Sequence, residues 1–87
     1  MARLIPAAER ILRARKLIQK ARDFPVPAEL GVRDFSYVAQ IKDLLQQARD
    51  LVKFIPYSVS ATPELKKEVA DLFKESEQAE KEILHKS

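Results

Sequence analysis

The sequence predicts an all-α fold, either a small three-helix bundle or a helical hairpin with a third helical arm. Strands need frequent turns, but the chain has a single glycine and no asparagine to form them. Hydrophobic residues make up 46% of the chain and charged residues 33%, a balance typical of a folded helical protein. Apolar residues recur at spacings of three and four in three segments that prolines separate.

The first predicted helix spans residues 6–23. Pro6 suits the first helical position, because its fixed φ matches the helix and its missing N–H would have no partner there. Pro25 disfavours helical geometry at the preceding residue and so ends the helix, and we expect Phe24 to fold back onto the apolar face. That face consists of Ala7, Ile11, Ala14, Ile18 and Ala21, widened by Leu4, Leu12 and Leu17.

The second predicted helix spans residues 35–55, with Asp34 or Ser36 as its cap and Pro56 as its end. Its inner stripe consists of Val38, Ile41, Leu45, Ala48, Val52 and Ile55, flanked by Leu44 and Leu51. Residues 26–31 and 56–62 are predicted connectors. They are short enough to favour an up-down-up arrangement.

The third predicted helix spans residues 63–85. Thr62 can cap it, Pro63 suits its first position and Glu64 favours the positive end of the helix dipole. Its stripe consists of Leu65, Val69, Leu72, Ser76, Ala79 and Ile83, with Phe73 beside it. Because the stripe thins after Phe73, we expect the end of this helix to project into solvent or onto a partner.

The chain is short enough to need help in folding. We expect one domain covering residues 1–87, held together by Ile11, Ile18, Leu45 and Val52. On folding, a chain of this size buries only about 60–65% of the surface that its unfolded form exposes. Disulfides are excluded because there is no cysteine, and a single histidine, His85, predicts no metal site. A protein partner remains as the source of extra stability. The longest uncharged stretch contains two prolines, so no transmembrane segment is predicted.

Positive charge is concentrated at the start of the chain. Residues 1–22 carry seven basic residues against Glu9 alone, a net charge of +6, and residues 23–87 carry a net charge of −3. Four interpretations of the basic helix remain open: a solvated face, a nucleic-acid surface, a mitochondrial targeting segment, and a docking face for an acidic protein or anionic lipid head groups. We favour the last two, which are compatible with each other.

No pattern of residues predicts catalysis or a cofactor. Ser58 and Ser60 lack a neighbouring histidine, and Tyr37 and Tyr57 are expected to pack with their hydroxyls in water. Alternating lysines neutralise the carboxylates of the third helix, Glu64, Glu68, Asp71 and Glu75. The chain also has no glycine-rich phosphate loop, so we expect a protein that is not an enzyme.

The segment RARKLIQKARDFP, residues 13–25, resembles the opening helix of the LYR family of small mitochondrial proteins. Leu17 and Ile18 match the family's apolar pair, Ala21 its small residue and Arg15 the arginine of its tripeptide. Phe35 resembles a later family phenylalanine, and residues 41–45 its last amphipathic helix, so the similarity extends over residues 11–55. Arg13 and Ala14 replace the leucine and tyrosine of the tripeptide, which leaves binding of acyl carrier protein open. The resemblance implies an accessory or assembly subunit of a respiratory complex.

A second similarity concerns ARDFPVPAEL, residues 21–30, and the helix that follows it. This combination resembles the helical segment beyond the catalytic core of JmjC-type lysine demethylases. It implies a helical interaction module of a chromatin or nucleic-acid-associated complex, located in the nucleus. Nucleic acid itself is the less favoured partner, because the basic helix lacks aromatic stacking residues except at its end.

The sequence thus predicts a non-enzymatic helical accessory subunit at the matrix side of the mitochondrial inner membrane, attached to a respiratory complex. Its predicted partner-binding residues are Arg10, Arg13, Arg15, Lys16, Lys20, Phe24 and Phe35.

Overall fold

The protein is all-α, as the sequence predicts, in a computed structural model that describes residues 6–59 and 61–84. Its helices are α1 (Ala7–Asp23), α2 (Phe35–Val52) and α3 (Pro63–Leu84), and no strand occurs among the described residues. Two short 3-10 helices, η1 (Gly31–Arg33) and η2 (Ile55–Tyr57), lie in the connections.

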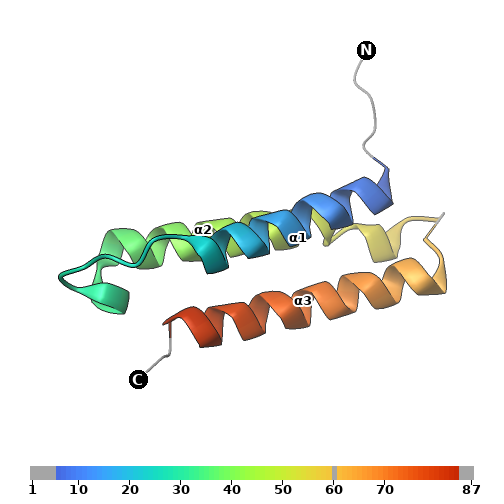
Figure 1. The fold of residues 1–87 in the computed structure, drawn as a ribbon. Helices are drawn as coiled ribbons and strands as arrows, with labels where there is room; N and C mark the ends of the chain where they lie inside the picture. The colour runs from blue at the N-terminus through green and yellow to red at the C-terminus, as the bar shows by residue number, and fades with distance from the viewer. Residues whose placement is uncertain (1–5, 60, 85–87) are drawn as a thin grey trace, which may run out of the picture.

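The helices form an elongated bundle with a longest extent of 48 Å (Figure 1). α1 and α2 make an antiparallel hairpin, and α3 returns along both helices, parallel to α1. The start of α1, η2 and the first turn of α3 therefore share one end of the bundle. The connection between α1 and α2 shares the other end with the last turn of α3.

A hydrophobic core runs between the three helices. The four residues predicted to hold the bundle together are all buried: Ile11, Ile18, Leu45 and Val52. Val69 and Leu72 complete the core from α3. Phe24 packs against it after α1 ends, with its ring centroid 6.0 Å from that of Tyr37, which confirms that Phe24 folds back onto the apolar face.

The helix starts follow local capping chemistry. Pro6 has an extended ψ of 148° and is the N-cap of α1, so the prediction that it is the first helical residue is wrong by one position. The carboxylate of Asp34, not Ser36, caps α2 by accepting the backbone N–H of Tyr37 at 3.0 Å. At α3, the Thr62 hydroxyl accepts the N–H of Leu65 at 3.2 Å.

The predicted end of the second helix is wrong, because α2 ends at Val52 and not at residue 55. Pro56 disfavours α-helical geometry at Ile55, and the chain tightens into the 3-10 turn η2. The predicted end of the third helix, residue 85, lies outside the described residues.

The end of α3 does not project away from the bundle as the sequence suggested. Ser76 and Ala79 are fully buried, and Ile83 and Leu84 still pack against the core. The hydroxyl of Ser76 is satisfied within its own helix, because it donates to the carbonyl of Phe73 at 3.0 Å. Small residues at these positions therefore mark a close approach of α3 to the α1–α2 hairpin.

Candidate docking surface

Two arginines of α1 face α3. The guanidinium of Arg22 donates to the carboxylate of Glu82, and Nε of Arg15 lies 3.8 Å from Oε2 of Glu75. Both pairs join residues 60 positions apart, as expected for two parallel helices in register. Their side chains are between a third and a half exposed, so each pair contributes at most about 1 kcal/mol to stability. Arg15, predicted to bind a partner, thus already has a carboxylate nearby within its own chain.

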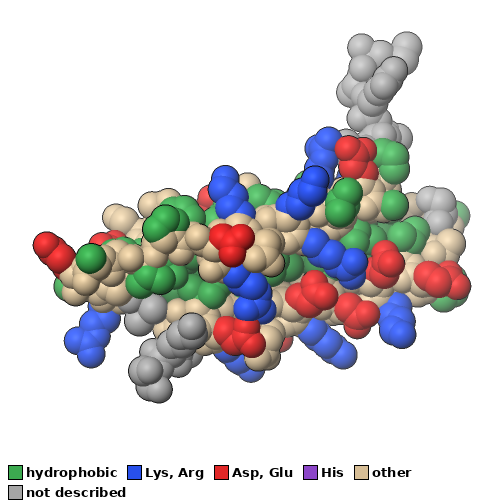
Figure 2. All heavy atoms as spheres, viewed as in Figure 1, with side chains coloured by type: hydrophobic (Ala, Val, Ile, Leu, Met, Phe, Trp, Pro, Cys, Tyr) green, Lys and Arg blue, Asp and Glu red, His purple; other side chains and the backbone are tan. Residues whose placement is uncertain are grey.

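Four other cations of α1 form a basic ridge: Arg10, Arg13, Lys16 and Lys20. Arg13, Lys16 and Lys20 are exposed, whereas Arg10 is half-buried and lies 80° around α1 from the buried Ile18. Successive residues of an α-helix are 100° apart, so Lys16 lies 200° around α1 from the buried Ile18. Arg13 is held by Glu9, whose carboxylate it contacts at 3.0 Å. For the other three cations, no ion pair occurs within residues 6–59 and 61–84. Figure 2 shows basic side chains projecting along the upper edge of the molecule, over α1.

A shallow groove runs between α1 and α2 beside the basic ridge. It has a volume of about 300 Å³ and is lined by Leu17, Gln47, Asp50 and Leu51. Leu17 lies 200° around α1 from Arg15, so the groove is on the opposite flank of α1 from α3. Both leucines are only partly buried and offer apolar surface at the floor of the groove.

Charged side chains lie beside the α1/α2 groove on both of its helices. On α1, Arg13 and Lys20 lie one turn before and one turn after the groove leucine. On α2, Asp50 accepts a hydrogen bond from Gln46 at 2.8 Å and forms an ion pair with Lys53 at 3.1 Å. The bond from Gln46, followed by that from Lys53, lowers the pKa of the Asp50 carboxyl below its ordinary value. The groove therefore has cations beside it on α1 and, on α2, a carboxylate that is already paired with Lys53.

The two predicted partner-binding phenylalanines have different environments. Phe24 is partly buried against the core, whereas Phe35, the first residue of α2, is 90% exposed. The structure thus brings together the four ridge cations and places Arg15 on the α3 flank. Phe24 belongs to the core, and Phe35 is exposed at one end of the bundle.

Sequence reasoning missed two surface features. Leu17 and Leu51, predicted at the edges of the apolar stripes, pack against the core and also line a groove that the sequence did not indicate. The prediction that both tyrosines pack holds for Tyr37, which is 3% exposed, and is wrong for Tyr57, which is 85% exposed. The only signal for the groove in the sequence was the width of the apolar stripes. They are wider than packing against a single helix requires. Nothing in the sequence pattern indicated how Tyr57 would point.

The described residues offer binding surfaces and no recognisable metal centre. No group of three or more histidine, aspartate or glutamate side chains within residues 6–59 and 61–84 is placed to hold a metal ion. No helix in this part of the chain is long and apolar enough to cross a membrane. The interpretations of Ser60 and His85 fall outside the described residues.

Comparisons of the chain with protein-family models, with curated proteins and with solved structures find no match. Function must therefore be argued from the surface itself.

Proposed function

We propose that this chain is a non-enzymatic helical accessory subunit that docks onto a larger protein through the basic ridge and the α1/α2 groove. The observation that supports this function most directly is that some cations of α1 pair with α3 and others do not in the part of the chain that the structure describes. Arg15 and Arg22 face carboxylates of α3, whereas Arg10, Lys16 and Lys20 form no ion pair among the described residues. Cations beside a partly open apolar groove are suited to a partner that supplies both carboxylates and apolar side chains.

The groove fits an amphipathic helix of the partner. Apolar side chains of that helix would cover Leu17 and Leu51, and its acidic residues would face Arg13 and Lys20. Neutral residues would lie along α2, where Asp50 is already paired with Lys53. In such an interface the apolar contacts provide most of the affinity, and the charges set orientation and association rate.

The proposed location is the matrix side of the mitochondrial inner membrane, on a respiratory complex. Its support is the resemblance of residues 11–55 to LYR-type proteins and the excess of basic residues in residues 1–22. Import of the full chain into isolated mitochondria tests this location. Failure of import together with nuclear enrichment would favour the chromatin-associated module instead.

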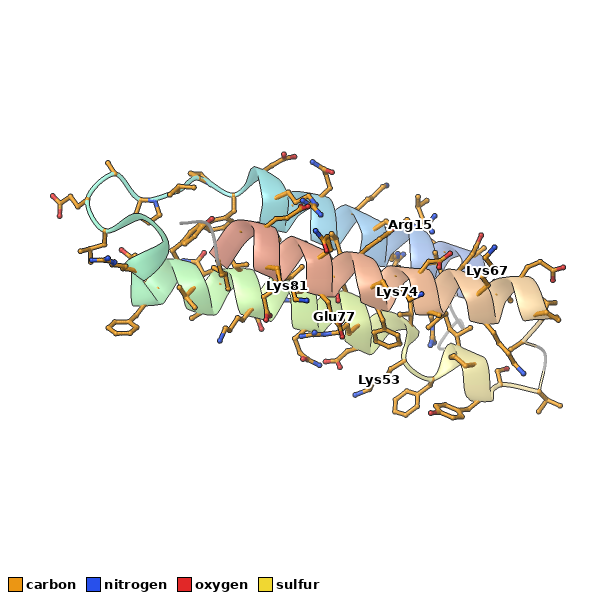
Figure 3. All side chains as sticks on the ribbon, turned by 90° about the horizontal axis from the view of Figure 1, so that it is seen from below. Arg15, Lys53, Lys67, Lys74, Glu77 and Lys81 are labelled. Atoms are coloured by element: carbon orange, nitrogen blue, oxygen red, sulfur yellow. The ribbon has the colours of Figure 1, made fainter. Side chains whose placement is uncertain are left out.

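The docking surface is tested by a charge reversal with a matched control. Arg10→Glu/Lys16→Glu/Lys20→Glu changes the ridge, and Lys67→Glu/Lys74→Glu/Lys81→Glu makes the same change in net charge on α3, where these exposed lysines follow one another along the helix (Figure 3). A partner recovered with the tagged wild-type chain and identified by mass spectrometry is then purified and titrated with each variant.

We expect the ridge variant to bind this partner at least tenfold more weakly and the α3 variant to bind it as the wild type does. Both variants should keep the helix content of the wild type, because the substituted side chains are outside the core. Equal binding by both variants, or equal loss by both, would show that the ridge is not the docking surface.

A further inference from the structure

Three large apolar side chains project from the chain where α2 turns into α3. Phe54 is 64% exposed, Tyr57 85% and Val59 106%, although they lie within six residues of one another. We call these three residues the apolar corner. Exposed apolar side chains scattered singly need no explanation, but a group of this kind often marks an interaction site.

The local fold holds two of the three side chains, Phe54 and Tyr57, in place. Residues three apart in a 3-10 helix lie on the same face, so Phe54 and Tyr57 project to the same side of η2. The N–H of Tyr57 donates to the carbonyl of Phe54 at 3.1 Å. Ile55, between them, is 5% exposed and anchors the turn in the core. The turn is thus fixed by Ile55, and the bundle does not use the two aromatic rings for its own packing.

Basic residues lie close in sequence to the corner. Nζ of Lys53 lies 5.1 Å from the centroid of the Phe54 ring, a cation–π contact, and 3.1 Å from the carboxylate of Asp50. Residues 49–67 contain four cations, Arg49, Lys53, Lys66 and Lys67, against two carboxylates, Asp50 and Glu64. Figure 3 shows Lys53 beside this connection and Lys67 on the first turns of α3 that follow it.

The other end of the bundle provides an internal contrast. It too exposes apolar side chains, with Val26 59%, Leu30 58% and Phe35 90% exposed. The connecting segments differ in charge, because residues 22–36 carry two arginines against Asp23, Glu29 and Asp34, a net charge of −1, whereas residues 49–67 have a net charge of +2. An anionic surface would therefore distinguish the two ends, although their apolar content is similar.

We propose that the apolar corner inserts into the interfacial layer of an anionic lipid bilayer, with Lys53, Lys66 and Lys67 facing the lipid head groups. Aromatic rings next to lysines suit this layer, where ring and alkyl groups enter the acyl boundary and charges stay in water. The two rings at η2 and the nearby Val59 are also too few for a stable protein interface, which needs about 800 Å² from each partner. The chain would lie on the membrane by this corner while α1 binds its protein partner.

The chain offers a spectroscopic probe at this position. It has no tryptophan, so Tyr57→Trp places a single indole in the corner. With vesicles of phosphatidylcholine and phosphatidylglycerol we expect its emission to shift to the blue and to become protected from acrylamide. With phosphatidylcholine alone, or with the mixed vesicles in high salt, both changes should be much smaller.

Vesicle sedimentation then compares the two ends. Phe54→Ser/Val59→Ser should lower the partition coefficient by about tenfold or more, since it removes two inserted apolar side chains. The matched variant Val26→Ser/Phe35→Ser, at the acidic end, should partition as the wild type does. Both changes are at exposed positions, and circular dichroism checks that each variant is folded.

Equal partitioning of the two variants would overturn the proposal. So would an indole that stays exposed to acrylamide while the protein sediments with vesicles, which would assign lipid binding to the basic ridge. If the indole is protected only when the protein partner is added, the corner is a protein contact and the lipid assignment is wrong. The docking function of α1 is judged separately, because its test uses the purified partner without lipid.

Discussion

Leu45 and Leu17 should respond differently to the same substitution, because one lies in the core and the other lines the groove. Leu45 is fully buried in α2, whereas Leu17 is partly exposed in α1. Replacing either residue with alanine removes the same apolar atoms. Only Leu45→Ala leaves an enclosed cavity, since the space vacated in Leu17→Ala opens into the groove and fills with water.

The expected costs follow from this difference. Leu45→Ala should lower the free energy of unfolding by about 3–4 kcal/mol, within the range for buried leucines, and Leu17→Ala by about 1–2 kcal/mol, close to the transfer term alone. An 87-residue chain has an unfolding entropy of about 0.18 kcal/mol/K. The Tm should therefore fall by about 16–22 °C for Leu45→Ala and by about 5–11 °C for Leu17→Ala.

Thermal and urea unfolding followed by circular dichroism measures both costs, and titration with the purified partner measures docking. Leu17→Ala should weaken docking by about tenfold while the protein remains folded. If Leu17→Ala is as destabilising as Leu45→Ala, or leaves docking unchanged, then Leu17 is a core residue and the groove is not part of the binding surface.

Three further predictions concern the structure around these surfaces. Phe24→Ser should lower the free energy of unfolding by about 1–3 kcal/mol because it removes a ring from the core, whereas Phe35→Ser should change it by less than about 0.5 kcal/mol, as measured by urea unfolding. Asp34→Ala should cost about 1 kcal/mol in the same assay through loss of the α2 cap, and Asp34→Ser should restore most of it. The hydrogen bond from Gln46 lowers the pKa of Asp50 in the folded state. The stability that this carboxylate adds should therefore be complete above the pKa of Asp50 in the unfolded chain. It should be lost as the pH falls through the pKa of Asp50 in the folded protein. An NMR titration of its side-chain carbon should thus give a midpoint below that of a free aspartate, and Gln46→Ala should raise this midpoint.

The core could be predicted from the sequence because it depends on local periodicity. Ile11, Ile18, Leu45 and Val52 fall on stripes with spacings of three and four, and a helix that buries one face must bury these residues. The end of α2 was harder to predict. Pro56 disfavours α-helical geometry at Ile55, and the residues before it can then form either a last α-helical turn or a 3-10 turn. That choice also depends on the burial of Ile55.

The candidate site could be predicted only in part, because its composition depends on where α3 lies. Arg15 and Lys16 are neighbours in the sequence and equally basic, but they point 100° apart on α1. Arg15 lies near Glu75, and Lys16 does not reach a carboxylate within the described residues. Sequence periodicity places both residues on the polar side of the helix. It does not show which of them meets another helix of the same chain.

Side-chain size, and not charge, sets the register of α3 against α1. If α3 slid by seven residues, Arg15 would meet Glu68 and Arg22 would meet Glu75, so the charge pattern would be satisfied again. The same slide would bring Val69 to the place of Ser76 and Leu72 to the place of Ala79, where the structure has the smallest side chains of the α3 stripe, fully buried. Overpacking of this kind costs about 1–3 kcal/mol at each position, more than the exposed ion pairs contribute. The observed register therefore follows from Ser76 and Ala79, and it leaves Arg15 and Arg22 beside carboxylates while the basic ridge stays on the outside.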